Sequence, residues 1–464
     1  MGIQKRVAGS TDSERIADLE RRLEEAFKEI QALREENARL RRELEEWKRG
    51  HRERSKRRSS RAEGQRTGEK QRPGRKLGHP GAQRPVPAPD RQVTYPVPDH
   101  CECGGCVDPI DETVATVVQD IPVVRPENVE HVAQVGRCVR CGCRVVAKLP
   151  GAVDAGQSIA RVQLGPNVQS LIISLRYEHR TPLRGIATIL GTWFGIEITA
   201  GAVSQLIDRW RERSTGSYTE IEQHVRTRPI VGLDETGLRQ DGVGGWAWLA
   251  RTDDASLFRV ELSRGSWVAE QMLGANFRGV VCTDFYGVYT ARADWNHAYC
   301  GAHLIREVKK VAEMDPCFKT ERFSHFIRNW YVLGKQAQLG SRTEQQQARN
   351  QLDVMVTGRG PWEHPDIMRL CNRIDTNFDG ITAFLDDPRI PADNNATERD
   401  IRPLAVYRRV TGGTRSENGS HSLAHWMSVT QTLHKNGLPL RDYMIDLNDA
   451  HRHGRAPPSV FTAH

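Results

Sequence analysis

The feature that most constrains the fold is a series of short apolar segments between residues 228 and 300, two of which end on an aspartate. Residues 230–233 lead to Asp234, and residues 279–283 lead to Asp284. Between them, residues 246–250 and 257–262 form two further apolar runs around a turn, and residues 268–273 have helical spacing. Short apolar runs bounded by turn residues predict strands. We therefore expect three strands, a helix and a fourth strand, with carboxylates at two strand ends.

A third acidic residue, Glu398, makes this pattern informative about chemistry, since a single aspartate at a strand end is common in turns. Residues 393–403 predict a short helix that Asp393 caps and Pro403 ends, with Glu398 and Arg402 on one face. Three carboxylates suit two Mg²⁺ (or Mn²⁺) ions about 3.5–4 Å apart, an arrangement used for phosphoryl transfer. The predicted catalytic and metal-binding residues are Asp234, Asp284 and Glu398.

The order of these elements is that of an RNase H-like fold, which predicts an α/β catalytic core at residues 228–411. Residues 312–385 predict a helical insertion, and residues 412–464 a C-terminal helical tail. Cys300, His303 and Arg306 are expected to support the metal ligands or orient phosphate, with a packed core histidine equally compatible at His303. The basic residues near the core that we expect to contact DNA phosphates are Arg399, Arg402, Arg408, Arg409 and Arg415; for the turn at 411–415 an ordinary solvated loop is the alternative.

Residues 12–49 carry a heptad pattern that predicts a coiled coil. Its two seams are occupied by Ile16, Leu23, Ile30, Asn37 and Leu44, and by Leu19, Ala26, Leu33, Leu40 and Trp47. Five such heptads favour a left-handed coiled coil, and one asparagine in the seam is typical of a two-stranded register. A homodimer or larger assembly is therefore predicted, with an amphipathic helix packed on its own chain as the alternative.

The segment 50–99 predicts a basic, disordered linker that binds DNA. Residues 51–76 hold eleven Lys/Arg and three Glu, a net charge of +8 that equals the formal excess of the whole chain. Arginine and lysine beside glycine and proline can follow a minor groove and neutralise phosphates. The residues expected to do so are Arg72, Arg75 and Lys76; a solvated linker is the alternative.

Six of the ten cysteines cluster within residues 100–150 and predict a small zinc-binding unit. Cys138 and Cys141 have the two-residue spacing of a zinc knuckle, followed by a glycine. The first group is less regular, so either Cys103 with Cys106 or Cys101 with Cys103 completes a four-thiolate structural Zn²⁺ site. Cys143 is expected to be the spare, and reduced structural cysteines are the alternative.

Residues 160–226 predict a helical domain of the helix-turn-helix type. Apolar residues recur at helical spacing over 171–190 and again over 203–210. A glycine-containing turn separates the two stretches, and Thr199 is a suitable cap for the second helix. Helical hairpins are common, so this pattern only favours a role in reading DNA.

Several motifs together resemble transposases of the insertion-sequence-66 family, a DDE superfamily member. They are residues 231–236 (Val-Gly-Leu-Asp-Glu-Thr), 283–287 (Thr-Asp-Phe-Tyr-Gly), 300–306 (Cys-Gly-Ala-His-Leu-Ile-Arg) and 393–399 (Asp-Asn-Asn-Ala-Thr-Glu-Arg). Residues 74–81 and the cysteine unit resemble that family's N-terminal regions, although Cys101 and Cys103 depart from its usual spacing. The resemblance implies an RNase H-like core with the three acidic residues as metal ligands, and a bacterial mobile element whose terminal inverted repeats the protein binds. It also implies small accessory proteins of the same element as partners.

The chain is thus expected to be a multidomain α+β transposase that cleaves and joins double-stranded DNA at element ends and targets. No run of 18 apolar residues is present and no apolar signal segment follows the N-terminal basic residues, so no membrane partner is expected and a cytoplasmic, nucleoid-associated protein is predicted. Two alternatives are a non-catalytic DNA-binding regulator and an RNase H-like nuclease that cuts without joining.

Overall fold

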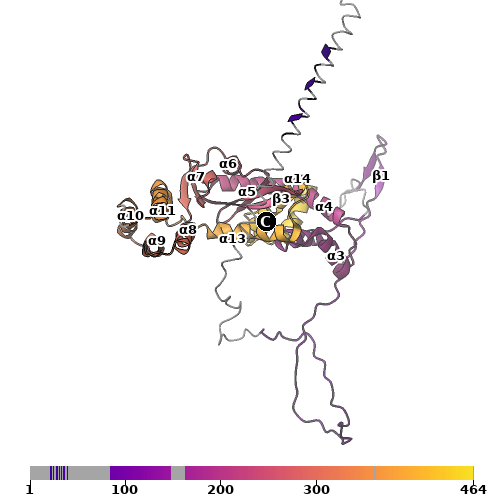
Figure 1. The fold of residues 1–464 in the computed structure, drawn as a ribbon. Coiled ribbons are helices and arrows are strands. Elements are labelled where there is room, and N and C mark those ends of the chain that lie inside the picture. Colours follow the sequence, from indigo (N-terminus) through magenta and orange to yellow (C-terminus); the bar gives the residue numbers. More distant parts are fainter. Residues whose placement is uncertain are drawn as a thin grey trace, which may run out of the picture. The chain divides into compact units, whose positions relative to one another are not determined.

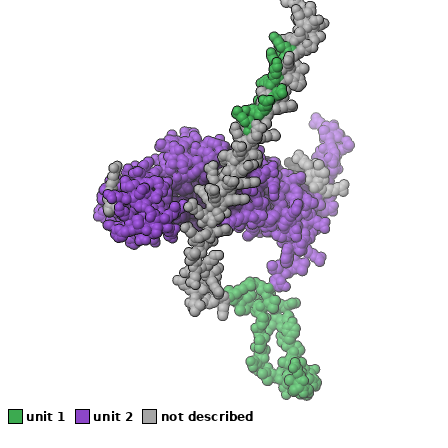
Figure 2. Space-filling view, viewed as in Figure 1, with its two compact units in different colours: residues 1–119 green, residues 120–464 purple. Residues whose placement is uncertain are grey.

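The computed structural model describes residues 84–147, 162–358 and 362–462, and ten positions between Arg21 and Arg39. The chain divides into two compact units, Met1–Gln119 and Asp120–His464, which Figure 2 colours separately. In the first unit the ten described N-terminal positions are helical and exposed. Among the predicted seam residues only Leu33 is described, and it is 56% exposed. The other seam residues, and the basic segment up to residue 83, lie outside the described residues.

The second unit opens with a small antiparallel hairpin and continues with helices. The hairpin pairs β1 (Val135–Arg137) with β2 (Arg144–Val146). Helices α2 (Pro166–Ile173), η1 (Ser174–Glu178, a π-helix), α3 (Leu183–Phe194), α4 (Ala200–Arg213) and α5 (Thr215–Thr227) follow. Gly195 ends α3 at φ 66°, and the Thr199 hydroxyl accepts a hydrogen bond from the Ala202 N–H at 3.2 Å. The expected turn and the expected N-cap are therefore both present.

A five-stranded mixed sheet forms the centre of the second unit, in the order β5-β4-β3-β6-β7. Strands β3 (Ile230–Gln240), β4 (Val243–Arg251) and β5 (Ser256–Glu261) pair antiparallel, while β6 (Val280–Thr283) and β7 (Asn296–Tyr299) run parallel to β3. Helix α6 (Ser266–Leu273) connects β5 to β6, and α7 (Gly287–Thr290) follows β6. A mixed sheet with this order of elements agrees with the predicted RNase H-like core.

Helices from the middle of the chain gather at one end of the sheet (Figure 1). They are α8 (Gly301–Met314), α9 (Phe318–Gln338), α10 (Arg342–Thr357), α11 (Pro365–Thr376), α12 (Phe378–Thr382) and the 3₁₀ turn η2 (Ala383–Leu385). Their apolar faces form a second hydrophobic core, in which Trp330 and Trp362 are each 2% exposed. The two tryptophans therefore pack inside the helical segment.

Helix α13 (Asn395–Thr411) is longer than the sequence predicts, since it continues through Pro403 to Gly412. The prediction that Pro403 ends the helix was wrong. Proline removes one backbone hydrogen bond, but Leu404 and Tyr407 beyond it are 1% and 2% exposed. Burial of these two side chains against the core offsets that loss.

The residues expected to form a C-terminal tail instead contain a helix that is part of the core. Helix α14 (Glu417–Lys435) lies along the edge strand β5, and α15 (Leu440–Arg452) packs on α2. The Ser428 and Thr432 hydroxyls accept hydrogen bonds from the N–H groups of Phe258 and Ser256, at 2.8 and 3.2 Å. These bonds satisfy two N–H groups at the edge of the sheet, which could otherwise pair with another chain and favour aggregation.

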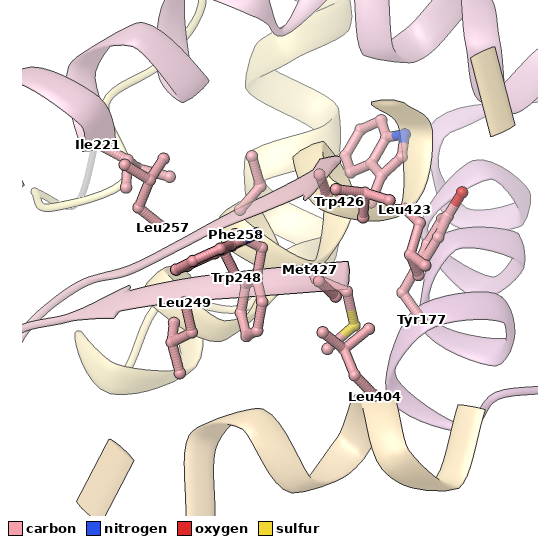
Figure 3. Close-up of a cluster of buried hydrophobic side chains, with 14 of the residues drawn as sticks. Tyr177, Ile221, Trp248, Leu249, Leu257, Phe258, Leu404, Leu423, Trp426 and Met427 are labelled. Atoms are coloured by element: carbon pink, nitrogen blue, oxygen red, sulfur yellow. The ribbon is translucent and has the colours of Figure 1, made fainter. Parts of the chain in front are cut away.

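One hydrophobic core joins the sheet to the helices on either side of it in the sequence. Figure 3 shows Trp248 and Phe258 of the sheet with Leu404 of α13 and Met427 of α14, beside Tyr177 of η1. Residues of α2 to α5 belong to the same core. The helical segment 162–227 therefore shares its core with the sheet.

Candidate active site

Two acidic residues stand at the same edge of the sheet because β3 and β6 are parallel neighbours. Gly232 of β3 pairs with Cys282 of β6, and extending this register by two residues places Asp234 beside Asp284. Each aspartate also orders its own backbone: Asp234 Oδ1 accepts from the Glu235 N–H at 2.9 Å, and Asp284 Oδ1 from the Tyr286 N–H at 2.9 Å. Asp284 follows the end of β6 as predicted, but the expected strand end at Asp234 was wrong, because β3 continues to Gln240 in its pairing with β4. The parallel register of β3 and β6 still brings both carboxylates into one region.

The first turn of α13 brings Glu398 to this region through a close approach to β3. A Cβ atom at Gly232 would lie 2.1 Å from Thr397 Oγ1, so only glycine allows this distance. Asn394 fixes the contact: its side-chain amide donates to the Leu233 carbonyl at 3.0 Å, and its N–H donates to Cys300 Sγ at 3.1 Å. Asn394 is 4% exposed and is therefore a structural link between β3, α13 and the loop before α8.

The electrostatics of Asp234 reflect burial together with neighbouring negative charge. Burial, and then the carboxylates of Glu235, Asp284 and Glu398, raise the pKa of Asp234 to about 7. The three predicted ligands therefore interact with one another. Such a set of acidic groups suits divalent cations with hard oxygen ligands, such as Mg²⁺ or Mn²⁺, because the cations compensate the repulsion.

Glu398 also contacts the pair of residues at the start of α8. Its carboxylate lies 3.3 Å from Arg306 Nη2 and 3.7 Å from His303 Nδ1. Cys300, His303 and Glu398 form one of two groups of three possible metal ligands within the described residues whose ligand atoms all lie within 4.8 Å of one another; the other is Asp315, Cys317 and His364. The acidic trio is not such a group, so its carboxylates stand further apart.

A network around Glu235, which sequence reasoning missed, holds the β6 loop against β3. Glu235 faces away from Asp234, is only 4% exposed, and is bonded by Arg264 at 2.6 Å and by the Tyr289 hydroxyl. The Arg264 guanidinium also stacks on the Tyr286 ring at 3.7 Å. Because Tyr286 and Tyr289 lie two and five residues after Asp284, and the Tyr286 N–H donates to Asp284 Oδ1, this network positions that aspartate. The sequence gives only the Asp-Glu pair as a signal.

An open groove of about 360 Å³ lies beside Asp284, and two basic side chains are among the residues that line it. Arg306 and Lys310 line it together with His303, Phe285 and Tyr286; Glu307, which also lines it, is bonded to Arg373. A basic groove at a carboxylate site is a suitable surface for a phosphate backbone.

The predicted DNA-contacting residues fall into three classes. Arg72, Arg75 and Lys76 lie outside the described residues. Arg408 donates to Thr236 Oγ1 at 3.1 Å and to the Gly237 carbonyl at 2.7 Å, so its guanidinium joins α13 to β3. The remaining predicted arginines are exposed: Arg399, Arg402, Arg409 and Arg415. The glycine-rich turn after α13 also binds β3, since the Thr414 N–H donates to the Arg239 carbonyl at 2.9 Å.

The predicted zinc ligands belong to two different units, Cys101, Cys103 and Cys106 to the first and Cys138 and Cys141 to the second. Within each group the cysteines interact. Hydrogen bonds from Cys103 lower the pKa of Cys101, and bonds from Cys143 and then Cys138 lower the pKa of Cys141. Gly142, at φ 72°, forms the turn after Cys141. Cys143 is thus hydrogen-bonded to Cys141, and its expected place outside the zinc ligands stays a prediction.

Comparison with known proteins gives the family. A model of the family described as "Transposase IS66 family" matches residues 161–422, more than half of the chain's 464 residues. This chain belongs to that family. The match spans the sheet, the helical insertion and Glu398, and the family is one of DDE transposases. The protein is therefore a member of a class of DNA-processing enzymes associated with transposition.

The similar curated proteins come from Sinorhizobium fredii (strain NBRC 101917 / NGR234) and are themselves uncharacterized. The protein y4jO is 24% identical over 42% of this chain and 60% of its own length, so the chain spans less than two thirds of it. The protein y4jD is 22% identical over 74% of this chain and 73% of its own length, and y4hP is 21% identical over 78% and 74%. No helix among the described residues is long and apolar enough to cross a membrane.

Proposed function

We propose that the protein is the transposase of a bacterial insertion sequence, which binds the terminal inverted repeats and catalyses metal-dependent strand cleavage and strand transfer. The observation that carries this proposal is the convergence of Asp234, Asp284 and Glu398 at one edge of the sheet, where burial, Glu235 and the other two carboxylates raise the pKa of Asp234. Membership of the IS66 transposase family supports the same chemistry. A regulator that only binds DNA would have no need to bring these three charges together.

In this mechanism Asp234, Asp284 and Glu398 would hold two divalent cations, Mg²⁺ or Mn²⁺. When bound, such cations supply Lewis acidity to the attacking and leaving oxygens of phosphoryl transfer. The chain's own residues position these carboxylates: Asn394 fixes the start of α13 on β3, and Glu235 with Arg264 fixes the loop after Asp284. One site then serves hydrolysis of a strand end and the attack of the freed 3′-hydroxyl on a second DNA.

DNA would lie over the basic groove beside Asp284. Arg306 and Lys310 line that groove, and Arg399, Arg402, Arg409 and Arg415 extend the positive surface along and beyond α13. His303 and Arg306 contact Glu398, and Cys300 lies near both, so we assign these three residues to orienting Glu398 or phosphate. The segment holding Arg72, Arg75 and Lys76 would add contacts along the duplex.

The N-terminal region would organise the assembly. The heptads at 12–49 would join two chains, and residues 160–226 would read the element ends. Four thiolates from Cys101, Cys103, Cys106, Cys138 and Cys141 would hold a structural Zn²⁺, since lowered thiol pKa values at Cys101 and Cys141 favour the thiolate that binds metal. Small accessory proteins of the same element are proposed as further partners, and the DNA of the bacterial cytoplasm as the site of action.

The test is transposition in cells of a marked element supplied with its neighbouring reading frames, comparing the wild type with Asp284→Asn. We expect movement with the wild type and none with the variant, while both bind the element ends in a gel-shift assay. Equal movement with both would overturn the assignment of the site. Binding of the ends without movement by either protein would favour the non-catalytic regulator.

A further inference from the structure

A pocket of about 340 Å³ lies on another side of α13 from the acidic site. It is formed by η1, the first turns of α13 and the C-terminal half of α14, and its residues include Arg180, Arg399 and Gln431. Arg399 follows Glu398 directly on α13, so the pocket and the acidic site share one helix. The predicted catalytic chemistry uses no residue of this pocket.

The chain adopts two uncommon backbone conformations next to the pocket. Residues Ser174–Glu178 form a π-helix, and Arg180 just after it has φ 61°, one of two positive φ values at non-glycine residues within the described part of the chain. A left-handed conformation costs a non-glycine residue about 1–3 kcal/mol and persists where the surrounding structure imposes it, often at functional sites. The conformation at Arg180 places its side chain among the residues that line the pocket.

The two arginines of the pocket are available to a ligand. In residues 84–147, 162–358 and 362–462, neither Arg180 nor Arg399 has an ion pair, and Arg180 Nε is buried without a hydrogen-bond partner. Asp400, an acidic residue of the lining, is already paired with Lys435 at 2.8 Å and with Arg251 at 3.3 Å. The charged residues of the lining that remain are two arginines, Arg180 and Arg399, and one glutamate, Glu178. The pocket therefore has an excess of positive charge.

The rest of the lining is apolar and amphipathic rather than purely basic. Tyr177, Pro403 and Met427 form one part of it, and Figure 3 shows Tyr177 and Met427 in the buried cluster that supports it. Gln431 donates to the Asp400 carbonyl at 3.1 Å, which leaves its side-chain oxygen as an acceptor. A free inorganic anion would have no use for these apolar groups, whereas a nucleobase carries both a flat apolar face and polar edges.

We propose that this pocket binds one unstacked nucleotide of the DNA substrate, with its phosphate on Arg180 and Arg399 and its base against Tyr177, Pro403 and Met427. The inference rests on the proposed function and deepens it, because it assigns a site that holds DNA in register with Glu398. A base removed from the stack is held by contacts of this kind in enzymes that act on DNA ends or bases. Glu178 and Gln431 would accept hydrogen bonds from its polar edge.

The test uses the full chain with the substitution Arg180→Gly, which removes the guanidinium and suits φ 61°. The thermal midpoint should therefore be equal to or above that of the wild type. Binding of a fluorescein-labelled oligothymidylate, measured by fluorescence anisotropy without divalent metal, should weaken by about ten-fold, as expected for loss of a charge-assisted hydrogen bond.

Two control variants test whether relief of backbone strain, or loss of an exposed arginine outside the pocket, changes the binding of the oligonucleotide. Asp241→Gly relieves the other positive φ, of 49°, in the β3–β4 turn, and Arg342→Ala removes one exposed arginine from α10. Both should bind the oligonucleotide as the wild type does. Photocrosslinking of the same strand carrying 5-iododeoxyuridine should attach it to peptides that contain Tyr177 or Met427.

Binding by Arg180→Gly equal to that of the wild type, or crosslinks confined to peptides outside η1, α13 and α14, would overturn the proposal. Both measurements are repeated with Asp284→Asn, which does not alter the pocket. Transposition by Asp284→Asn equal to that of the wild type, with intact crosslinks, would therefore count against the proposed function alone. Transposition by Arg180→Gly equal to that of the wild type would count against the pocket alone.

Discussion

Helices α13 and α14 both lie against the central sheet, and both contain many polar side chains, but these side chains have different partners. In α13 and the residues just before it, Asn394, Glu398 and Arg399 are directed to the acidic site or to a pocket. In α14, Ser428 and Thr432 bond the backbone of β5. We therefore propose that Asn394, Glu398 and Arg399 serve the chemistry and the binding of DNA, whereas Ser428 and Thr432 serve the stability of the sheet edge.

The largest expected difference concerns the acidic residues in the first turns of the two helices. Glu398→Gln should reduce transposition by about a thousand-fold or more, because a metal-binding carboxylate becomes a neutral amide. Glu417→Gln, in the first turn of α14, should leave transposition within about two-fold, since the helix-dipole contribution of an exposed glutamate is small. Transposition frequency in cells measures both effects. Similar losses in the two variants would contradict the claim that the acidic residue of α13 has a role that the acidic residue of α14 lacks.

Asn394→Ala should lower the free energy of unfolding by about 2–3 kcal/mol, because the Leu233 carbonyl and the buried amide lose their bond. It should also lower strand cleavage by the folded protein, since α13 loses its link to β3. Asn395→Ala is the matched control, as the neighbouring asparagine is exposed. Chemical denaturation and cleavage assays on both variants check this; equal stabilities would show that Asn394 does not hold the helix.

On α14, His425 should make stability dependent on pH. Burial lowers the pKa of His425 from 6.5 to about 3, so the folded state keeps the ring neutral where the unfolded chain is protonated. The contribution of the neutral His425 ring to the free energy of unfolding is then fully present above about pH 6.5. It decreases by about 1.4 kcal/mol per pH unit as the pH falls from there towards 3. Denaturation curves of the wild type and His425→Gln should diverge less at pH 5 than at pH 7.5; a constant difference would contradict this account.

The smallest effect is expected at the sheet edge. Ser428→Ala removes the acceptor for the Phe258 N–H and should lower the free energy of unfolding by about 1 kcal/mol. Thr432→Val, which removes the acceptor for the Ser256 N–H, should lower it by about the same amount. Neither change should alter the transposition activity of the folded fraction. Thermal midpoints and activity per folded molecule measure the two quantities. A loss of activity without a loss of stability would show that the Ser428 and Thr432 hydroxyls do more than stabilise the sheet edge.

Local patterns were sufficient for part of this arrangement. Asp234 and Asp284 could be predicted because each directly follows a short apolar run, although β3 continues past Asp234 to Gln240 and only β6 ends before its aspartate. Thr199 could also be predicted as an N-cap, because a cap depends only on residues within one turn of the helix. The sheet order and the family followed from the order of such local signals.

Other features depend on contacts between distant residues and could not be read locally. Glu235 is buried only because Arg264 and Tyr289 reach it from elsewhere in the chain. The hydrogen bond from Arg408 to the Gly237 carbonyl of β3 was not predicted, and its expected contact with DNA stays a prediction. Pro403 was predicted to end its helix, but packing of Leu404 and Tyr407 outweighs one lost hydrogen bond. The hydrogen bonds of the Ser428 and Thr432 hydroxyls could not be predicted from the sequence, because their partners are backbone N–H groups of β5.

The central claim is that Asp284 binds a divalent cation together with Asp234 and Glu398. The most direct test is strand cleavage of the element ends by purified Asp284→Cys, with Mg²⁺ and with Mn²⁺, because thiolate is a poor ligand for Mg²⁺ and a better one for softer cations. We predict no cleavage in Mg²⁺ and partial recovery in Mn²⁺, with DNA binding unchanged. Cleavage at the wild-type rate in Mg²⁺ would contradict the account.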